Sequence, residues 1–291
     1  MTVDRPAPDR RRNAYRADLA AEALRGTVAA PRYVAGEARQ VVDAAVPLRG
    51  TPDAQAPWAT QVLFGEHVVL YEERAGWAWV QLAGDGYVGY LPGSALSQRV
   101  EAPTHWVRAR STWLYARPDF KSVPSLALSM NAAVRVVEID AAFAKLVDGR
   151  FVPTPHIAEH DCRAPDFVAV AESFLGVPYL WGGKTRLGVD CSGLLQLAIH
   201  ASGQPCPRDS DMQLAEVGER APVGDDFSGL ARGDLVFWPG HVGIMLDAVR
   251  LLHANAHHMA VAVEPLRVAA QRIARTGQAT PAVKRLPPRS G

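Results

Sequence analysis

The sequence predicts an α+β chain in which small all-β units come first and a domain of helices followed by strands comes last. Two features support this prediction. From about residue 41 to about residue 160, short β-branched and aromatic runs are broken by Gly, Pro and Asp, as in small barrels. After Pro165, helical runs precede strand-like runs, which is an α+β order. The chain of 291 residues is long enough for two or three domains.

Composition and charge exclude several classes of function. The formal net charge of +1 provides no field that would attract nucleic acid or an anionic membrane. No run of about 18 apolar residues exists, so we expect no membrane span. The basic cluster at 10–12 is followed by Arg16, Asp18 and Glu22, which do not form the apolar core of a signal peptide. We therefore expect a cytoplasmic protein. The oligomeric state stays open.

The cysteines argue against a disulfide framework. There are three, which is an odd number without a CxxC pair: Cys162, Cys191 and Cys206. This pattern also argues against structural zinc, and we expect neither a metal nor another cofactor. Free cysteines are usually buried, so Cys162 and Cys206 are expected to be core residues.

The amino-terminal part is predicted as an arm followed by two β units. We expect residues 1–40 to be an amino-terminal arm, polar and loose over about 1–15, with a short helix over 18–24, capped by Asp18. The β units would occupy 41–102 and 103–160. They share a pattern, because 46–53 is echoed by 112–119, 68–70 by 134–136, and 90–92 by 151–153. Two copies of one unit explain this most simply; the alternative is one continuous β domain. The pattern resembles the bacterial SH3-like barrels that accompany cell-wall peptidases.

Residues 161–275 form the predicted α+β domain, with a tail at 276–291. Apolar spacing predicts a helix over 166–175, closed by Gly176, and a second over 194–200. The basic stretch 267–275 is interpreted as a helix with a solvated face. Strands are predicted at 235–238, 241–246, 251–253 and 260–263.

Cys191 has the sequence context of a thiol nucleophile. It lies where a turn leads into the second helix, after Asp190 and before Ser192 and Gly193. At a helix start, unpaired backbone N–H groups and the helix dipole lower a thiol pKa. The same N–H groups can receive the oxyanion of a tetrahedral intermediate. A thiolate at this position would still need an oriented base.

Two histidines are candidates for that base and its partner. His241 opens one predicted strand, and His253 lies twelve residues later at the end of the next. If a hairpin around 247–250 joins these strands, the two imidazoles lie side by side. One could then face the thiol while the other orients it. His257 and His258 lie close in sequence and compete for the second role.

Residues from about 165 to 268 resemble the catalytic domain of the NlpC-type cysteine peptidases, a papain-like fold. The matching stretches, in order, are 178–183 (Pro-Tyr-Leu-Trp-Gly-Gly), 190–193 (Asp-Cys-Ser-Gly), 208–210 (Arg-Asp-Ser), 233–238 (Gly-Asp-Leu-Val-Phe-Trp), 241–244 (His-Val-Gly-Ile) and 252–254 (Leu-His-Ala). With the preceding β units, the whole chain is similar to bacterial γ-D-glutamyl-L-diamino-acid endopeptidases of the dipeptidyl-peptidase VI type. The fold implied is two SH3-like β-barrels followed by an α+β papain-like domain.

The resemblance also implies roles for particular residues. Cys191 would be the nucleophile, His241 the base and His253 the polar third member. The pocket would be lined by Tyr179, Asp190, Ser192, Asp209 and Ser210. Asp209 and Ser210 could instead only cap the next helix, and the neighbouring Trp181 is expected to be a core aromatic.

The first β unit adds an expectation about specificity. In the family, a Glu and a Tyr of that unit close the pocket and bind the free amine of an N-terminal L-Ala. Glu66 matches the Glu, and Tyr87 is our choice for the Tyr, with Tyr90 as the alternative. Glu66 could also be an ordinary solvated charge.

The reaction implied is hydrolysis of the amide between D-Glu, through its side-chain carboxyl, and a diamino acid. The expected partner is a small murein peptide, cut during cytoplasmic recycling. The alternatives are a secreted hydrolase of intact peptidoglycan and a non-catalytic module that binds wall peptides.

Overall fold

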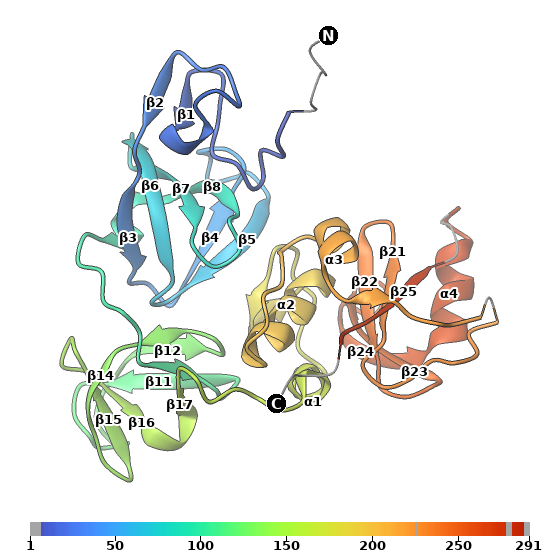
Figure 1. Cartoon of the computed structure of the whole chain (residues 1–291). Coiled ribbons are helices and arrows are strands. Elements are labelled where there is room, and N and C mark those ends of the chain that lie inside the picture. Colours follow the sequence, from blue (N-terminus) through green and yellow to red (C-terminus); the bar gives the residue numbers. More distant parts are fainter. Residues whose placement is uncertain (1–6, 225, 278–280, 288–291) are drawn as a thin grey trace. The chain divides into compact units, whose positions relative to one another are not determined.

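A computed structural model describes residues 7–224, 226–277 and 281–287 (Figure 1). The chain divides into two compact units. The first comprises residues up to 107, 112–128 and 132–157. The second comprises the residues from 158 onward, together with the short segments 108–111 and 129–131. Each unit is described by itself below.

The amino-terminal segment differs from the predicted arm and helix. Leu19–Ala21 is strand β1, which pairs in parallel with β2 (Arg32–Val34), and Glu22–Leu24 is a single 3-10 turn, η1. Leu19 and Ala14 are buried against Trp79 of the first β unit. Tertiary packing therefore overrides the local helical pattern, and residues 7–15 are not a loose arm. The predicted arm's first six residues lie outside the described residues.

The first β unit is one antiparallel sheet with the strand order β5-β4-β8-β7-β6-β3-β9. It is an open sheet rather than the closed barrel expected, and β5 and β9 are its edges. It begins with β3, slightly before residue 41. The elements are β3 (Glu37–Val41), β4 (Ala45–Arg49), β5 (Trp58–Leu63), β6 (His67–Arg74), β7 (Trp77–Leu82), β8 (Val88–Pro92), the 3-10 turn η2 (Gly93–Ala95) and β9 (Leu96–Ser97).

The second β unit repeats elements of the first. In both, a strand leads through a 3-10 turn into a final strand: β8-η2-β9 and β16-η3-β17. Its sheets have the orders β12-β11-β16-β15-β14 and β13-β10-β17. The elements are β10 (His105–Val107), β11 (Ser111–Tyr115), β12 (Pro124–Ser129), β13 (Ala133–Val134), β14 (Val136–Ile139), β15 (Phe143–Leu146), β16 (Phe151–Pro153), η3 (Thr154–His156) and β17 (Ile157–Glu159).

The second compact unit contains a six-stranded sheet with the order β20-β25-β21-β22-β23-β24. Helix α2 packs against β22 and β23, and α4 packs against β24; Figure 1 shows the two helices on opposite sides of the sheet. The elements are α1 (Phe167–Glu172), β18 (Lys184–Thr185), β19 (Gly188–Val189), α2 (Cys191–Ala201), α3 (Ser210–Glu216), β20 (Glu219–Arg220), β21 (Leu235–Trp238), β22 (His241–Met245), β23 (Arg250–Asn255), β24 (Ala260–Pro265), α4 (Leu266–Ala274) and β25 (Ala282–Arg285).

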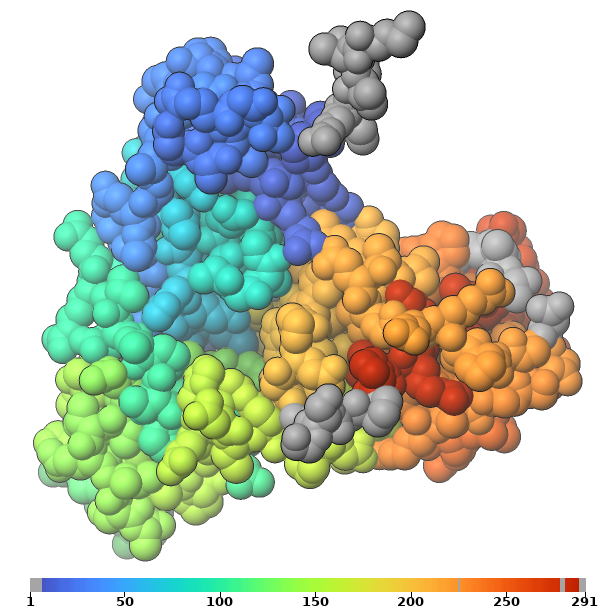
Figure 2. Space-filling view, viewed as in Figure 1, coloured from blue at the N-terminus to red at the C-terminus, as the bar shows by residue number. Residues whose placement is uncertain are grey.

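The predicted helices and strands of this unit are confirmed, but the predicted tail is not. Ala282–Arg285 is strand β25, which pairs with β20 and β21 inside the sheet. The sheet core includes Val283 together with Val236 and Trp238. Figure 2 shows red carboxy-terminal residues lying next to orange residues of the same unit. Residues 278–280 and 288–291 of the predicted tail lie outside the described residues.

No helix within the described part of the chain is long and apolar enough to cross a membrane.

Candidate active site

Cys191 is the first residue of α2, as the sequence predicted. Asp190 has extended backbone at the N-cap position, and its Oδ1 accepts the backbone N–H of Gly193 at 2.7 Å. This bond satisfies one of the N–H groups that a helix start leaves without a partner. Gly193 is required by space, because a Cβ there would lie 2.3 Å from the carbonyl oxygen of Gly183. The Asp-Cys-Ser-Gly sequence thus fixes the thiol at the helix terminus.

A buried arginine supports this turn from behind. Arg208, whose side chain is only 1% exposed, donates to Asp190 Oδ2 at 2.7 Å and to Ser192 Oγ at 2.7 Å. Asp190 Oδ2 also accepts the backbone N–H of Gly182 at 2.8 Å. A guanidinium can be buried only where its charge and donors are matched, and here the helix cap supplies the match. Arg208 was not among the expected site residues, although it begins the Arg-Asp-Ser stretch.

The pKa of the Cys191 thiol is raised to about 11, in contrast to the expected lowering. Burial is the largest cause, and the carboxylate of Asp190 adds to it. The backbone N–H groups of Val242 and Ser192 act in the opposite direction. Burial, together with the carboxylate that caps the helix, therefore outweighs the effect of the helix terminus on the thiol pKa. The effect of Val242 also places the thiol beside the first residues of β22.

The histidine pair lies on neighbouring strands, as the hairpin prediction required. Strands β22 and β23 pair antiparallel, with Ile244 opposite Leu252. Continuing this register by one residue puts Gly243 opposite His253, so His241 and His253 are diagonal neighbours on one face of the sheet. The Nε2 atom of His241 lies 2.8 Å from Nδ1 of His253. His257 is exposed and stacks edge-on against His258 instead.

Both imidazoles are in their neutral form near neutral pH. Burial lowers the pKa of His241 to about 3, and the neighbouring His253 adds to the shift. Burial also lowers the pKa of His253 to about 4, although the carboxylate of Glu264 opposes it. A neutral imidazole has one N–H donor and one acceptor nitrogen. The bond between the two rings therefore has a direction, and that direction decides which nitrogen of His241 can accept a proton.

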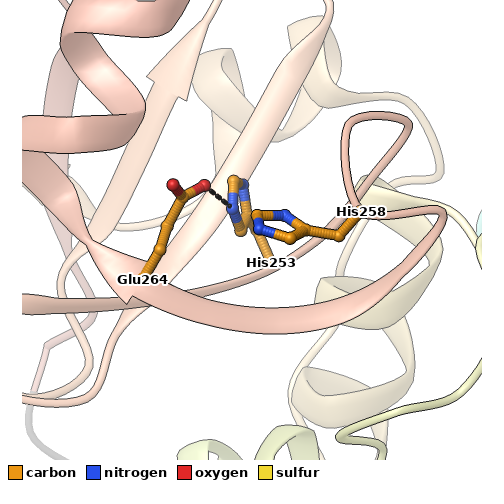
Figure 3. A group of neighbouring side chains, drawn as sticks. All are labelled: His253, His258 and Glu264. Carbon is orange, nitrogen blue, oxygen red and sulfur yellow. Dashed lines mark hydrogen bonds and ion pairs between the residues drawn. The ribbon is translucent and has the colours of Figure 1, made fainter.

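Glu264 and Arg272 extend the histidine pair, and the sequence interpretation missed both. Glu264 Oε1 lies 2.9 Å from His253 Nε2, as drawn in Figure 3. Arg272 donates to both carboxylate oxygens, at 2.7 and 2.5 Å. Burial alone would raise the pKa of Glu264, but the bonds from Arg272 and His253 lower it to about 2. Arg272 belongs to the helix whose basic residues were interpreted as a solvated face.

Three neighbouring side chains at this end of the histidine pair have the donor atoms of a metal site. The ligand atoms of His253, His258 and Glu264 lie within 4.8 Å of one another (Figure 3). However, Arg272 already occupies both oxygens of Glu264, and His258 Nδ1 contacts Asn255 Oδ1 at 2.9 Å. A cation at this position would be repelled by the Arg272 guanidinium and would compete with it for Glu264, so the donor set fits a hydrogen-bonded chain better than a metal.

The expected pocket residues are placed around the thiol to differing degrees. Tyr179 is half-buried, and burial followed by the charges of Cys191 and Asp190 raises its pKa to about 12, so its hydroxyl lies near the thiol. Asp209 has the N-cap position of α3 but makes no side-chain cap bond, and Ser210 begins the helix. Asp190 and Ser192 are buried and engaged by Arg208. Contact with substrate stays a prediction for all five.

Two expectations about core residues are wrong. Trp181 is 65% exposed rather than packed in the core. Cys162 is exposed, whereas Cys206 is buried as expected.

Glu66 and Tyr87 lie in the first compact unit, at the same end of its sheet. Glu66 ends the turn before β6, and its Oε2 accepts the backbone N–H of Leu63 at 3.1 Å. Tyr87 is buried in the turn after β7. Because Leu82 at the end of β7 is opposite Val68 at the start of β6, the two turns are neighbours. The hydroxyl of Tyr90, the alternative, accepts a bond from Arg16.

Comparison with known proteins agrees with this architecture. Residues 176–275 match the NlpC/P60 family, and residues 48–96 match the bacterial dipeptidyl-peptidase SH3 domain. A γ-D-glutamyl-L-lysine dipeptidyl-peptidase of Bacillus cereus is 27% identical over 246 residues, which cover 71% of this chain and 70% of that protein. Dipeptidyl-peptidase 6 of Lysinibacillus sphaericus is 28% identical, over 72% of this chain and 84% of that protein.

A solved structure supports the fold. The crystal structure of an NlpC/P60 family protein from Bacillus cereus superimposes with a TM-score of 0.72 at 22% identity, covering 86% of this chain and all of that one. Together with the helix-terminal thiol and the paired histidines, these findings lead to one conclusion: this chain is a cysteine-type peptidase with an NlpC/P60 domain of papain-like fold, preceded by a bacterial SH3-like domain.

Proposed function

We propose that the chain hydrolyses the bond between the γ-carboxyl of D-Glu and a diamino acid in small murein peptides. Two observations carry the proposal: the 2.8 Å contact between His241 and His253, and a thiol at a helix start that interacts with the backbone N–H of Val242, the residue after His241 in β22. The relatives named as γ-D-glutamyl-L-lysine dipeptidyl-peptidases supply the substrate class. Cys191 is the proposed nucleophile, His241 the base and His253 its orienting partner.

The proposed mechanism starts from a neutral Cys191 thiol and a neutral His241 imidazole. The pKa of the thiol is raised to about 11 and that of His241 is lowered to about 3, so the thiol keeps its proton at rest. His241 takes this proton as Sγ attacks the amide carbon. The backbone N–H groups at the start of α2 receive the developing oxyanion. The imidazolium then gives the proton to the leaving amine of the diamino acid, and water hydrolyses the thioester.

Specificity for a free amino terminus is proposed for the first SH3-like domain. A carboxylate pairs well with an ammonium group, and Glu66 is a half-buried carboxylate at a turn adjoining that of Tyr87. In this proposal the two side chains limit the substrate to L-Ala-γ-D-Glu before the scissile bond. In the second compact unit, Asp209, Ser210 and Tyr179 are the further residues proposed to contact the substrate.

The proposed setting is cytoplasmic recycling of murein peptides. The odd number of cysteines without a CxxC pair fits a reducing compartment. A demand for free L-Ala would favour released peptides over intact peptidoglycan, in which this amine is capped by the lactyl group.

The test compares three substrates with one purified protein. L-Ala-γ-D-Glu-L-Lys, its N-acetyl form and intact peptidoglycan are incubated separately, and products are identified by mass spectrometry. We expect L-Ala-γ-D-Glu and free lysine from the first, and catalytic efficiency about 10–100-fold lower on the acetylated form, from a charge-assisted bond of about 1.5–3 kcal/mol. Equal cleavage of all three would instead support a hydrolase of the intact wall.

A further inference from the structure

We infer that Glu264, held by Arg272, is a positioning group that sets the tautomers of both histidines and so makes Nδ1 of His241 the base. This rests on the proposed roles of Cys191, His241 and His253. The chain of contacts runs from Arg272 through Glu264 and His253 to His241, with every link between 2.5 and 2.9 Å.

The strand register builds this chain. Strands β23 and β24 pair antiparallel, with Leu251 opposite Glu264 and His253 opposite Ala262. His253 and Glu264 are therefore diagonal neighbours on the same face, a separation that long side chains can span. Arg272 lies eight residues after Glu264, on the helix that directly follows β24. The side chains of His253 and Glu264 are only 1% and 8% exposed, so water does not compete for these contacts.

The donor and acceptor count leaves one arrangement of protons. An ionised carboxylate only accepts hydrogen bonds, so His253 must donate to Glu264 from Nε2. A neutral His253 then has its lone pair on Nδ1. His241 must donate to it from Nε2, which leaves the lone pair of His241 on Nδ1. This nitrogen is the one available to take the proton of Cys191.

Arg272 keeps Glu264 in the acceptor form. The guanidinium of Arg272 binds both carboxylate oxygens of Glu264. Its positive charge therefore offsets the electrostatic effect of the Glu264 carboxylate on His241. Arg272 lowers the pKa of His241 whereas Glu264 raises it. Because these effects oppose each other, the pair acts mainly by orientation and tautomer rather than by stabilising an imidazolium. When the carboxylate that contacts a catalytic histidine directly is replaced by an amide, the histidine adopts the wrong tautomer and kcat falls by about 10⁴-fold. Glu264 is one ring further away, so we expect a smaller loss, of about 10–100-fold.

The decisive experiment observes the tautomers directly. Full-length protein labelled with ¹⁵N-histidine is examined by long-range ¹H–¹⁵N NMR at pH 7, with resonances assigned from single His→Gln variants. In the wild type we expect both His241 and His253 to be protonated on Nε2. In Glu264→Gln, whose amide can either donate or accept, we expect the two tautomers of His253 to be mixed. A wild-type His253 protonated on Nδ1 would overturn the inference, and this result does not depend on whether any Glu264 variant folds.

Kinetics with the tripeptide provide the second readout. Glu264→Gln should lower kcat about 10–100-fold and leave KM within about twofold, and Glu264→Asp should restore part of the loss. Arg267→Gln is the matched control, because it removes a cation of the same helix whose contacts are with Asp226 and Phe227 instead. A Glu264→Gln variant that folds, keeps the wild-type tautomers and turns over as fast as Arg267→Gln would refute the inference. If the wild type shows the expected tautomers but leaves the tripeptide intact, the proposed substrate fails while the inference stands.

Discussion

The buried pair of Arg208 and Asp190 should dominate the stability of the nucleophile's turn. We consider Arg208→Met, which keeps the length of the side chain and removes its charge. Asp190, whose side chain is 8% exposed, would then lose its counter-ion, although Gly182 and Gly193 still donate to it. Removing one partner of a buried ion pair costs about 3–5 kcal/mol. Because two backbone N–H groups still bind Asp190, we expect a loss of unfolding free energy at the lower end of this range, about 3 kcal/mol.

The assay must follow the domain that contains the pair, because the chain has two compact units. Cys206 is 2% exposed and belongs to the second unit. Pulsed alkylation of Cys206 in increasing urea, read by mass spectrometry, therefore reports unfolding of that unit, while the exposed Cys162 is an internal standard. A loss of about 3 kcal/mol lowers the urea midpoint by about 1–3 M.

Two controls make this prediction specific. Arg232→Met breaks contacts of a 40% exposed arginine with Asp166 and Glu172, and exposed pairs contribute about 1 kcal/mol or less. In an Asp190→Asn background, Arg208→Met should lower the free energy of unfolding by about 2 kcal/mol less than it does in the wild type. The reason is that no buried charge is then left without its counter-ion. The claim that the Arg208–Asp190 pair dominates the stability of this turn is contradicted by either of two results. One is an equal shift of the urea midpoint by Arg208→Met and Arg232→Met; the other is an effect of Arg208→Met that is the same with Asp190 and with Asn at position 190.

Three further predictions concern the site. Cys191→Ala should abolish turnover without moving the Cys206 midpoint, and residual turnover would exclude Cys191 as nucleophile. Glu66→Gln should weaken catalysis on the free tripeptide and narrow its advantage over the acetylated form; an unchanged ratio would contradict the ammonium contact. The folded pKa of His253, about 4, lies below the unfolded value near 6.5, so the unfolded chain binds the proton first and stability falls as pH falls below 6.5. Between pH 7 and 5 His253 accounts for about 2 kcal/mol of lost stability, and His241, whose pKa is also lowered, adds its own share. His253→Gln should therefore lose about 2 kcal/mol less than the wild type over this range, and equal acid sensitivity of both proteins would argue against the shift.

Much of the site follows from local sequence. The Asp-Cys-Ser-Gly turn before an apolar helical run predicts a thiol at a helix start, and the structure places Cys191 there with Asp190 as the cap. The short interval between His241 and His253 is that of a tight hairpin, so their contact could be predicted without knowing the rest of the fold. Both features depend only on residues close together in the chain.

The other parts depend on tertiary structure. Glu264 reaches His253 only through the register of β23 and β24, which no local pattern specifies. Arg272 resembles any other basic residue of an amphipathic helix until its partner is known. The direction of the thiol pKa shift was mispredicted because a capping carboxylate and burial act together, and burial is a property of the whole domain. The helix predicted over 18–24 failed for the same reason, since Leu19 packs against Trp79.

Trapping the acyl-enzyme tests the central claim most directly. Full-length protein is mixed with excess L-Ala-γ-D-Glu-L-Lys, quenched in acid within the first turnover, digested with a protease and mapped by mass spectrometry. We predict an L-Ala-γ-D-glutamyl group as a thioester on Cys191, absent from Cys162 and Cys206 and lost in Cys191→Ala. Continued release of lysine from Cys191→Ala, or an acyl group on another residue, would contradict the account.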